Sequence, residues 1–253
     1  MKALILASGR EEGMYNEENT PNSCMRIYEG RHLIQYSLDA AILSKAEEIL
    51  IAVGHGAEEI INAFGITYRD IRVKYLLLKE EHGFYDVMRM AREPLEHDDF
   101  IIFQGDEIVC SPRPYEMIEN FYEQDLFVEC GVVQVPVARV IRHGYGVMFD
   151  PYDYRVYRIV DKPRKAVNCF MGTGVCVFRN EIVEYLEPVY THELSEKKGL
   201  PGFIQCVIDD GYAVKLFVVG SGCIERNRVN DCDDVEQERV KDPEWKLELE
   251  PVF

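Results

Sequence analysis

The sequence predicts an α/β protein built around one mostly parallel sheet, and three observations support this. Short β-branched runs alternate with helical patterns through the first half of the 253-residue chain. Strand candidates crowd together after about Phe127, with turn residues between them. Hydrophobic residues make up 47% of the chain, enough to bury a large core. Together these features predict a parallel sheet covered on both faces, with a partly antiparallel extension.

The first half is typical of consecutive strand–helix units. Its predicted strands are residues 2–7, 48–53, 71–77 and 100–104, and its predicted helices begin at residue 33 and cover 57–64 and 85–91. Ligands of parallel sheets bind beyond the carboxyl ends of the strands. Ala7-Ser8-Gly9 and Gly105-Asp106 follow two of these strands, so we expect the binding site there.

The second half alternates strand candidates with turn signals. Its predicted strands are residues 128–137, 145–149, 154–160, 174–178 and 212–218, and its predicted helices cover 181–186 and 203–208 and start again at about Asp233. The chain contains no internal repeat, low-complexity segment or linker rich in Pro, Gly and Ser. We therefore expect a single domain, residues 1–253.

Composition excludes several classes of function. The 45 acidic and 28 basic residues give a net charge of −17, which disfavours a generic binder of nucleic acid or of an anionic membrane. No apolar run approaches the ~20 residues of a transmembrane helix, and no signal peptide is recognisable, so we expect a cytoplasmic protein that begins near Met1. The eight cysteines lack Cys-x-x-Cys spacing, which favours buried thiols over a zinc site.

Several separated segments, taken in order, resemble the sugar-phosphate nucleotidyltransferases, the nucleoside-diphosphate-sugar pyrophosphorylases. They are Lys2-Ala3-Leu4-Ile5-Leu6-Ala7-Ser8-Gly9, Thr20-Pro21-Asn22-Ser23-Cys24-Met25-Arg26-Ile27, Phe100-Ile101-Ile102-Phe103-Gln104-Gly105-Asp106, Gly144-Tyr145-Gly146-Val147, Val156-Tyr157-Arg158-Ile159-Val160-Asp161-Lys162-Pro163, Met171-Gly172-Thr173-Gly174 and Asn230-Asp231-Cys232-Asp233-Asp234-Val235. Each segment alone is a weak signal, but the ordered set is specific. The resemblance covers nearly the whole chain.

The resemblance implies a Rossmann-like three-layer α/β/α fold with a nucleotide-binding half, residues 1–126, and an acceptor-binding half, residues 127–253. It also implies an enzyme that transfers a nucleoside monophosphate from a nucleoside triphosphate to a sugar 1-phosphate or related phosphorylated small molecule. An ionised phosphate oxygen attacks the α-phosphorus and pyrophosphate leaves, so positioning and charge neutralisation do the catalysis. Mg²⁺ is the expected cofactor. The nucleotide base, the identity of the acceptor and the oligomeric state stay open, and a homo-oligomer is one option.

On the nucleotide side, the resemblance implies that the backbone of Ala7, Ser8 and Gly9 approaches the triphosphate. Gly83 would lie against the base, because a missing side chain permits close contact. Gly105 and Asp106 would end the strand that holds nucleotide and metal, with Asp106 as the carboxylate ligand of Mg²⁺. An N-cap role for Asp106 is the structural alternative, but the apolar run after it does not favour a helix.

On the acceptor side, the resemblance implies that Lys162 places its ammonium on the acceptor phosphate, and that Gly146 and Gly172 leave room for the acceptor. A turn lysine in solvent is the alternative for Lys162, and a β-bulge for Gly172. The second metal ligand is Glu225 or Asp231, and we favour Glu225.

The chain departs from the family's pattern at its catalytic cations. After Gly9 the run is Arg10-Glu11-Glu12-Gly13-Met14, which places two carboxylates where the triphosphate should lie. Asn22 stands where the family has a lysine, so Arg10 and Arg26 are the candidate catalytic cations. Phe84 and Tyr85 replace small residues of the base-reading segment, either as helix packing or as an altered pocket.

These departures leave alternatives open. One is a cytidylyltransferase acting on a non-sugar phosphate or phosphonate, and another is a catalytically impaired nucleotide-binding regulatory relative. A dinucleotide-binding oxidoreductase is disfavoured, because residues 9–13 do not form Gly-x-Gly-x-x-Gly.

Overall fold

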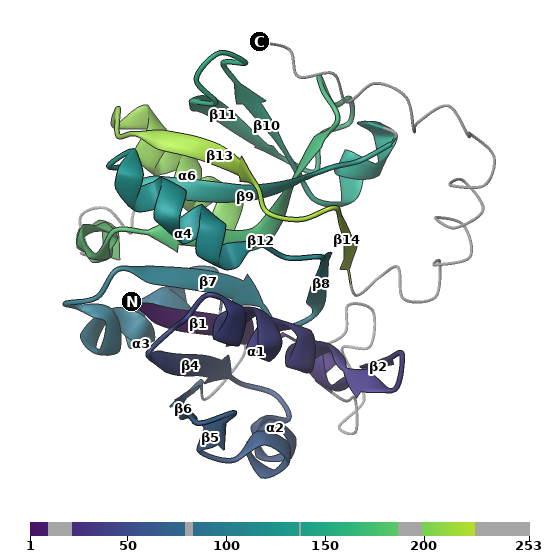
Figure 1. The fold of residues 1–253 in the computed structure, drawn as a ribbon, viewed down its shortest axis with the longest axis vertical. Coiled ribbons are helices and arrows are strands. Elements are labelled where there is room, and N and C mark those ends of the chain that lie inside the picture. The colour runs from purple at the N-terminus through teal and green to yellow at the C-terminus, as the bar shows by residue number, and fades with distance from the viewer. Residues whose placement is uncertain (10–21, 79–82, 137, 187–198, 226–253) are drawn as a thin grey trace.

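The computed structural model describes residues 1–9, 22–78, 83–136, 138–186 and 199–225. Within them, a ten-stranded mixed sheet runs in the order β11-β10-β12-β7-β1-β4-β6-β5, and β9 and β13 branch from β12 (Figure 1). The strands are β1 (Lys2–Ala7), β4 (Glu48–Val53), β5 (Thr67–Tyr68), β6 (Ile71–Leu77), β7 (Phe100–Gln104), β9 (Val128–Gln134), β10 (Tyr145–Phe149), β11 (Val156–Asp161), β12 (Phe170–Phe178) and β13 (Val214–Val218).

The first half forms the parallel part of the sheet. Strand β1 pairs in parallel with both β4 and β7, and β4 pairs in parallel with β6. Strands β1, β4 and β7 are almost wholly buried, in keeping with their continuous apolar runs. The carboxyl ends of β1, β4, β6 and β7 therefore lie at one edge of the sheet.

The second half extends the sheet in mostly antiparallel fashion. Strand β12 pairs antiparallel with β7, β9 and β10, and β10 pairs antiparallel with β11. Strand β13 then pairs in parallel with β9. The register between β12 and β9 shifts between Gly172 and Cys176, which marks a bulge-like irregularity of β12. The predicted α/β class and its antiparallel extension are confirmed.

Helices cover both faces of the sheet, as Figure 1 shows, with α1 and α4 in front of it and α6 behind. The helices are α1 (Leu33–Leu43), α2 (Ala57–Phe64), α3 (Phe84–Leu95), α4 (Pro114–Glu123) and α6 (Gly199–Asp209), with 3₁₀ segments η1 (Ser23–Met25), η2 (Ala138–His143) and η3 (Asn180–Leu186). One core cluster packs α3, α6 and η3 on the sheet, and the other packs α1, α2 and α4 on its opposite face.

Four short strands complete the described part of the chain: β2 (Ile27–Tyr28), β3 (Arg31–His32), β8 (Glu107–Cys110) and β14 (Gly222–Glu225). Strand β14 pairs antiparallel with β8, and β2 pairs antiparallel with β3. The predicted helix from Asp233 lies outside the described residues. The seven cysteines that the structure describes form no disulfide with one another. No helix among the described residues is long and apolar enough to cross a lipid bilayer.

Candidate active site

The first element of the site is the meeting of two strand ends. Gly9 follows β1 and Gly105-Asp106 follows β7, so the pairing of these strands brings the two segments to the same edge. The Gly105 backbone N–H donates to the Leu6 carbonyl at 2.9 Å. A Cβ on Gly105 would lie 2.9 Å from Cys24 Sγ and 3.0 Å from Leu6 O, so this close approach needs glycine.

A serine joins the two strand ends. The Ser23 hydroxyl lies 3.0 Å from Asp106 Oδ2 and 3.4 Å from the Gly9 carbonyl oxygen. Ser23 is fully buried and Asp106 half-buried. Glu107 continues into β8 rather than into a helix, so Asp106 caps no helix. The structure thus brings Gly9 and Asp106 together as predicted, and adds Ser23, which the sequence did not single out for a role.

The second predicted metal ligand lies on the neighbouring strand. Glu225 ends β14, where it is paired with Glu107 in the antiparallel register with β8. Asp106 directly precedes Glu107, so the backbones that carry Asp106 and Glu225 run side by side. The other candidate, Asp231, lies outside the described residues.

Lys162 lies at the same edge of the sheet as Asp106, three strands away. Asp161 is paired with Tyr145, Tyr145 with Gly172, and β12 is antiparallel to β7. Three strand-to-strand spacings, each typically about 4.8 Å in a regular sheet, thus lie between the two positions. Lys162 is exposed, has a left-handed backbone (φ 43°) and donates its N–H to the Gly144 carbonyl at 2.8 Å. Non-glycine residues adopt this conformation rarely, often at functional sites.

The two acceptor-side glycines differ in their surroundings. A Cβ on Gly146 would make only ordinary contacts, 3.4 Å from Ile141 Cγ2 and 3.5 Å from Pro163 Cγ. A Cβ on Gly172 would instead fall 1.9 Å from a ring carbon of Tyr145. This ring is buried, and its hydroxyl donates to the Thr173 carbonyl at 2.9 Å. Packing against Tyr145, at the irregularity of β12, therefore accounts for Gly172 without an acceptor.

The predicted base-reading segment lies at the start of α3, after β6. A Cβ on Gly83 would meet no atom within 4 Å, so open space adjoins this position. Phe84 and Tyr85 turn inward instead, and their ring centroids lie 5.5 Å and 5.8 Å from that of Phe203 on α6. Burial raises the pKa of Tyr85. The two aromatic residues thus serve helix packing, the structural interpretation given above.

Comparison with known proteins identifies the family. The family model described as nucleotidyl transferase matches residues 2–219. The chain belongs to the nucleotidyl transferase family. The family predicted from the ordered motifs is thereby confirmed.

Two relatives of this nucleotidyl transferase match more than nine tenths of its length. A low-salt glycan biosynthesis nucleotidyltransferase of Haloferax volcanii is 22% identical over 251 residues, which cover 97% of this chain and 68% of that protein. A glucose-1-phosphate thymidylyltransferase of Streptomyces griseus is 24% identical over 239 residues, which cover 93% of this chain and 65% of that one.

Solved structures share the fold. A UDP-glucose pyrophosphorylase complexed with UDP-glucose has a TM-score of 0.77 at 13% identity and covers 95% of this chain and 98% of its own. The inositol-1-phosphate CTP transferase from T. maritima has a TM-score of 0.71 at 18% identity and covers 96% of each chain. At these identities the likeness concerns the fold alone.

In this nucleotidyl transferase, Asn22 is a buried structural residue. Its Nδ2 donates to the Ala7 carbonyl at 2.8 Å and to the His55 carbonyl at 2.7 Å. Its Oδ1 accepts from the Cys24 N–H at 2.8 Å, which caps η1. The side chain is fully buried and ties the end of β1 to the loop after β4. Of the two candidate substitutes for the missing lysine, Arg26 is half-buried just after η1, and Arg10 lies outside the described residues.

The donor set fits Mg²⁺. The carboxylate of Asp106 lies at the strand edge, and the backbone of Glu225 on β14 is paired with that of Glu107, the residue after Asp106. Within the described part of the chain, no three His, Cys, Asp or Glu side chains are grouped to hold a metal. Mg²⁺ is usually held by one or two carboxylates together with substrate phosphates, so a site with Asp106 as one carboxylate suits this ion.

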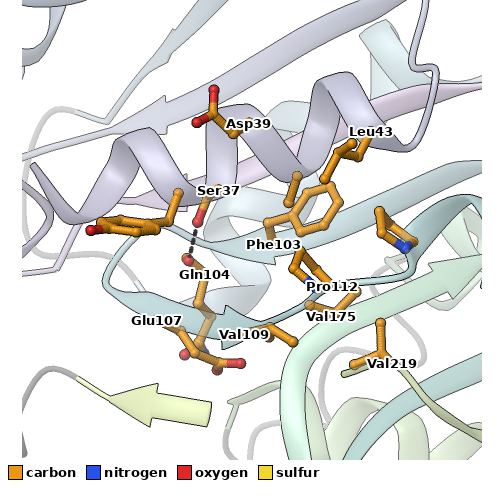
Figure 2. Close-up of a pocket in the computed structure, with 13 residues that line it drawn as sticks. Ser37, Asp39, Leu43, Phe103, Gln104, Glu107, Val109, Pro112, Val175 and Val219 are labelled. Carbon is orange, nitrogen blue, oxygen red and sulfur yellow. Dashed lines mark hydrogen bonds between the residues drawn. The ribbon is translucent and has the colours of Figure 1, made fainter. Parts of the chain in front are cut away.

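A small pocket of about 180 Å³ adjoins this site (Figure 2). It lies between α1 and the β7–β8 turn, and Gln104 and Glu107 on its wall flank Gly105-Asp106. The Ser37 hydroxyl on α1 donates to the Gln104 carbonyl at 2.7 Å. Pockets for small-molecule ligands are typically about 300–1,000 Å³, so this pocket is small for a nucleotide.

Proposed function

We propose that this protein transfers a nucleoside monophosphate from a nucleoside triphosphate to a sugar 1-phosphate or a related phosphorylated small molecule, releasing pyrophosphate. The observation that carries the proposal is the position of Asp106, which lies beside Gly9 at the edge of the sheet that also holds Lys162. Membership of the nucleotidyl transferase family supports it. So do relatives named for glucose-1-phosphate as substrate.

The proposed reaction forms one bond and breaks another. An oxygen of the acceptor phosphate bonds to the α-phosphorus, and the bond from that phosphorus to the oxygen of the β-phosphate breaks. No proton has to be removed, because the attacking oxygen is already ionised. Gly9 and its neighbours would offer backbone N–H groups to the triphosphate, and Lys162 would orient the acceptor phosphate.

The negative charge of the protein and of both substrates explains why a metal ion and basic side chains are needed. The protein carries a net charge of −17, and both substrates are anions. Asp106 and Glu225 would hold Mg²⁺, which neutralises phosphate charge when bound. Lys162, Arg164 and Lys165 are exposed together after β11 and would raise the local concentration of an anionic acceptor.

The test is pyrophosphate release with the common ribonucleoside and deoxyribonucleoside triphosphates, each against a panel of sugar 1-phosphates, cyclitol phosphates, phosphocholine and phosphonates. We expect Mg²⁺-dependent release with at least one pair, reduced about 100-fold or more by Asp106→Asn, because this variant removes a carboxylate ligand. Asp70→Asn is the matched control, since Asp70 is exposed in the β5–β6 turn and the charge changes equally.

Two results would contradict the proposal. One is no release with any pair. The other is triphosphate binding by calorimetry that ignores both Mg²⁺ and Asp106→Asn, which would favour a regulatory nucleotide-binding protein.

A further inference from the structure

Ser23 is a buried residue in contact with the proposed metal ligand. Its hydroxyl lies 3.0 Å from Asp106 Oδ2, across 83 positions of sequence. Ser23 has no solvent-accessible surface. A buried hydroxyl loses its hydrogen bonds to water, so it needs a hydrogen bond to a protein group instead. The Asp106 carboxylate provides one.

The backbone of Ser23 is fixed from two sides. Asn22 precedes it and is held by the Ala7 and His55 carbonyls, while its own Oδ1 caps η1. Cys24 follows it and packs on Gly105, where a Cβ would come within 2.9 Å of Cys24 Sγ. The η1 turn and the Gly105-Asp106 turn are therefore in direct contact, which fixes the backbone of Ser23 relative to that of Asp106.

The single hydroxyl proton of Ser23 has three candidate acceptors: Asp106 Oδ2 at 3.0 Å, the Gly9 carbonyl at 3.4 Å and Cys24 Sγ at 3.9 Å. The carboxylate is the nearest of the three and is charged, and charge-assisted hydrogen bonds are about twice as strong as neutral ones. The proton therefore goes to Asp106. This hydrogen bond fixes the rotation of the carboxylate about its Cβ–Cγ bond.

We propose that Ser23 is a positioning residue that orients the Asp106 carboxylate for the divalent cation. The inference rests on the proposed function, because it assigns the cation to Asp106. Residues that orient a metal ligand through a hydrogen bond typically change metal affinity by about 10- to 100-fold when removed. Ser23 would thus link the η1 turn, on which it lies, to the metal ligand.

The experiment measures binding of Mn²⁺ alone to the full chain, by the electron paramagnetic resonance signal of free Mn²⁺. We expect Ser23→Ala to raise the Kd for Mn²⁺ about tenfold, with Asp106→Asn showing the full loss of binding. Ser37→Ala is the matched control, because Ser37 is also buried and its hydroxyl also donates across elements, to the Gln104 carbonyl. Thermal unfolding of both serine variants without metal measures how much stability each substitution removes.

An equal Mn²⁺ affinity in wild type and Ser23→Ala would overturn the inference, and so would an equal loss in Ser37→Ala. Pyrophosphate release is measured separately as a function of Mg²⁺. If the wild type releases none while Ser23→Ala alone weakens Mn²⁺ binding, the proposed function fails and the role of Ser23 stands.

Discussion

Asn22 illustrates how one buried side chain determines what a position can do. The amide uses two donors and one acceptor, and a lysine ammonium has no acceptor for the Cys24 N–H. The residue that replaces the family's lysine is therefore committed to holding the end of β1. In the proposed reaction a cation for the triphosphate therefore has to come from another residue, and among the described residues of this segment Arg26 lies closest in sequence.

Glu129 is a buried carboxyl that makes stability depend on pH. It is fully buried on β9, where one oxygen accepts from Asn120 of α4 and Oε2 lacks a hydrogen-bond partner. Burial is the main cause that raises its pKa from 4.5 to about 8, partly offset by Asn120 and by Lys215 on the adjacent strand. The folded protein then holds this proton more tightly than the unfolded chain, so stability falls as pH rises between these two values.

We expect Glu129→Gln to remove this pH dependence, because glutamine can accept from Asn120 without ionising. The gain in unfolding free energy should be about 2–4 kcal/mol larger at pH 8 than at pH 5. Urea unfolding of both proteins at the two pH values measures it. An equal effect at both pH values would show that Glu129 does not titrate in this range.

At the scale of elements, strands and helices with strong apolar patterns could be predicted from sequence. The bounds predicted for residues 2–7, 48–53, 57–64, 71–77, 100–104 and 145–149 are those observed. Helix α4 was missed because Pro112 and Pro114 indicate a loop, although proline is favourable in the first turn of a helix. The pairing of β8 with β14 depends on contacts between segments more than 100 positions apart, which local periodicity does not report.

The site residues likewise divide into those that the sequence could predict and those that it could not. Gly9 and Asp106 could be brought together from the rule about strand ends. The contacts of Asn22 and Ser23 could not be predicted, because they are hydrogen bonds to residues that only the tertiary fold brings near. The hydroxyl of Ser23, next to the motif position of the missing lysine, was the only sequence signal.

Gly172 tests whether β10 and β12 pack as described. The methyl group of an alanine at position 172 would collide with the ring of Tyr145. This ring has little room to move, because it is buried and its hydroxyl donates a hydrogen bond to the Thr173 carbonyl. We expect Gly172→Ala to destabilise the fold by about 1–3 kcal/mol. Gly222→Ala is the control, because a Cβ there would meet nothing within 4 Å. Chemical unfolding compares the two, and equal midpoints would contradict the packing.

At the scale of the whole molecule, one sheet carries both halves of the proposed site. The parallel strands present Asp106, and the antiparallel strands present Lys162 at the same edge. A chain with a net charge of −17 repels anions at long range, so local cations must select where they bind. The group formed by Lys162, Arg164 and Lys165 is exposed at this edge.

Lys162 should therefore act on the acceptor and not on the triphosphate. We expect Lys162→Gln to raise KM for the acceptor about tenfold or more, the effect of losing a charged hydrogen bond, with KM for the triphosphate changed less than about twofold. Steady-state pyrophosphate release, with each substrate varied in turn, measures both constants. Lys165→Gln makes the same charge change on a neighbouring exposed lysine, so an equal rise in that variant would indicate general attraction of anions rather than a specific contact at Lys162.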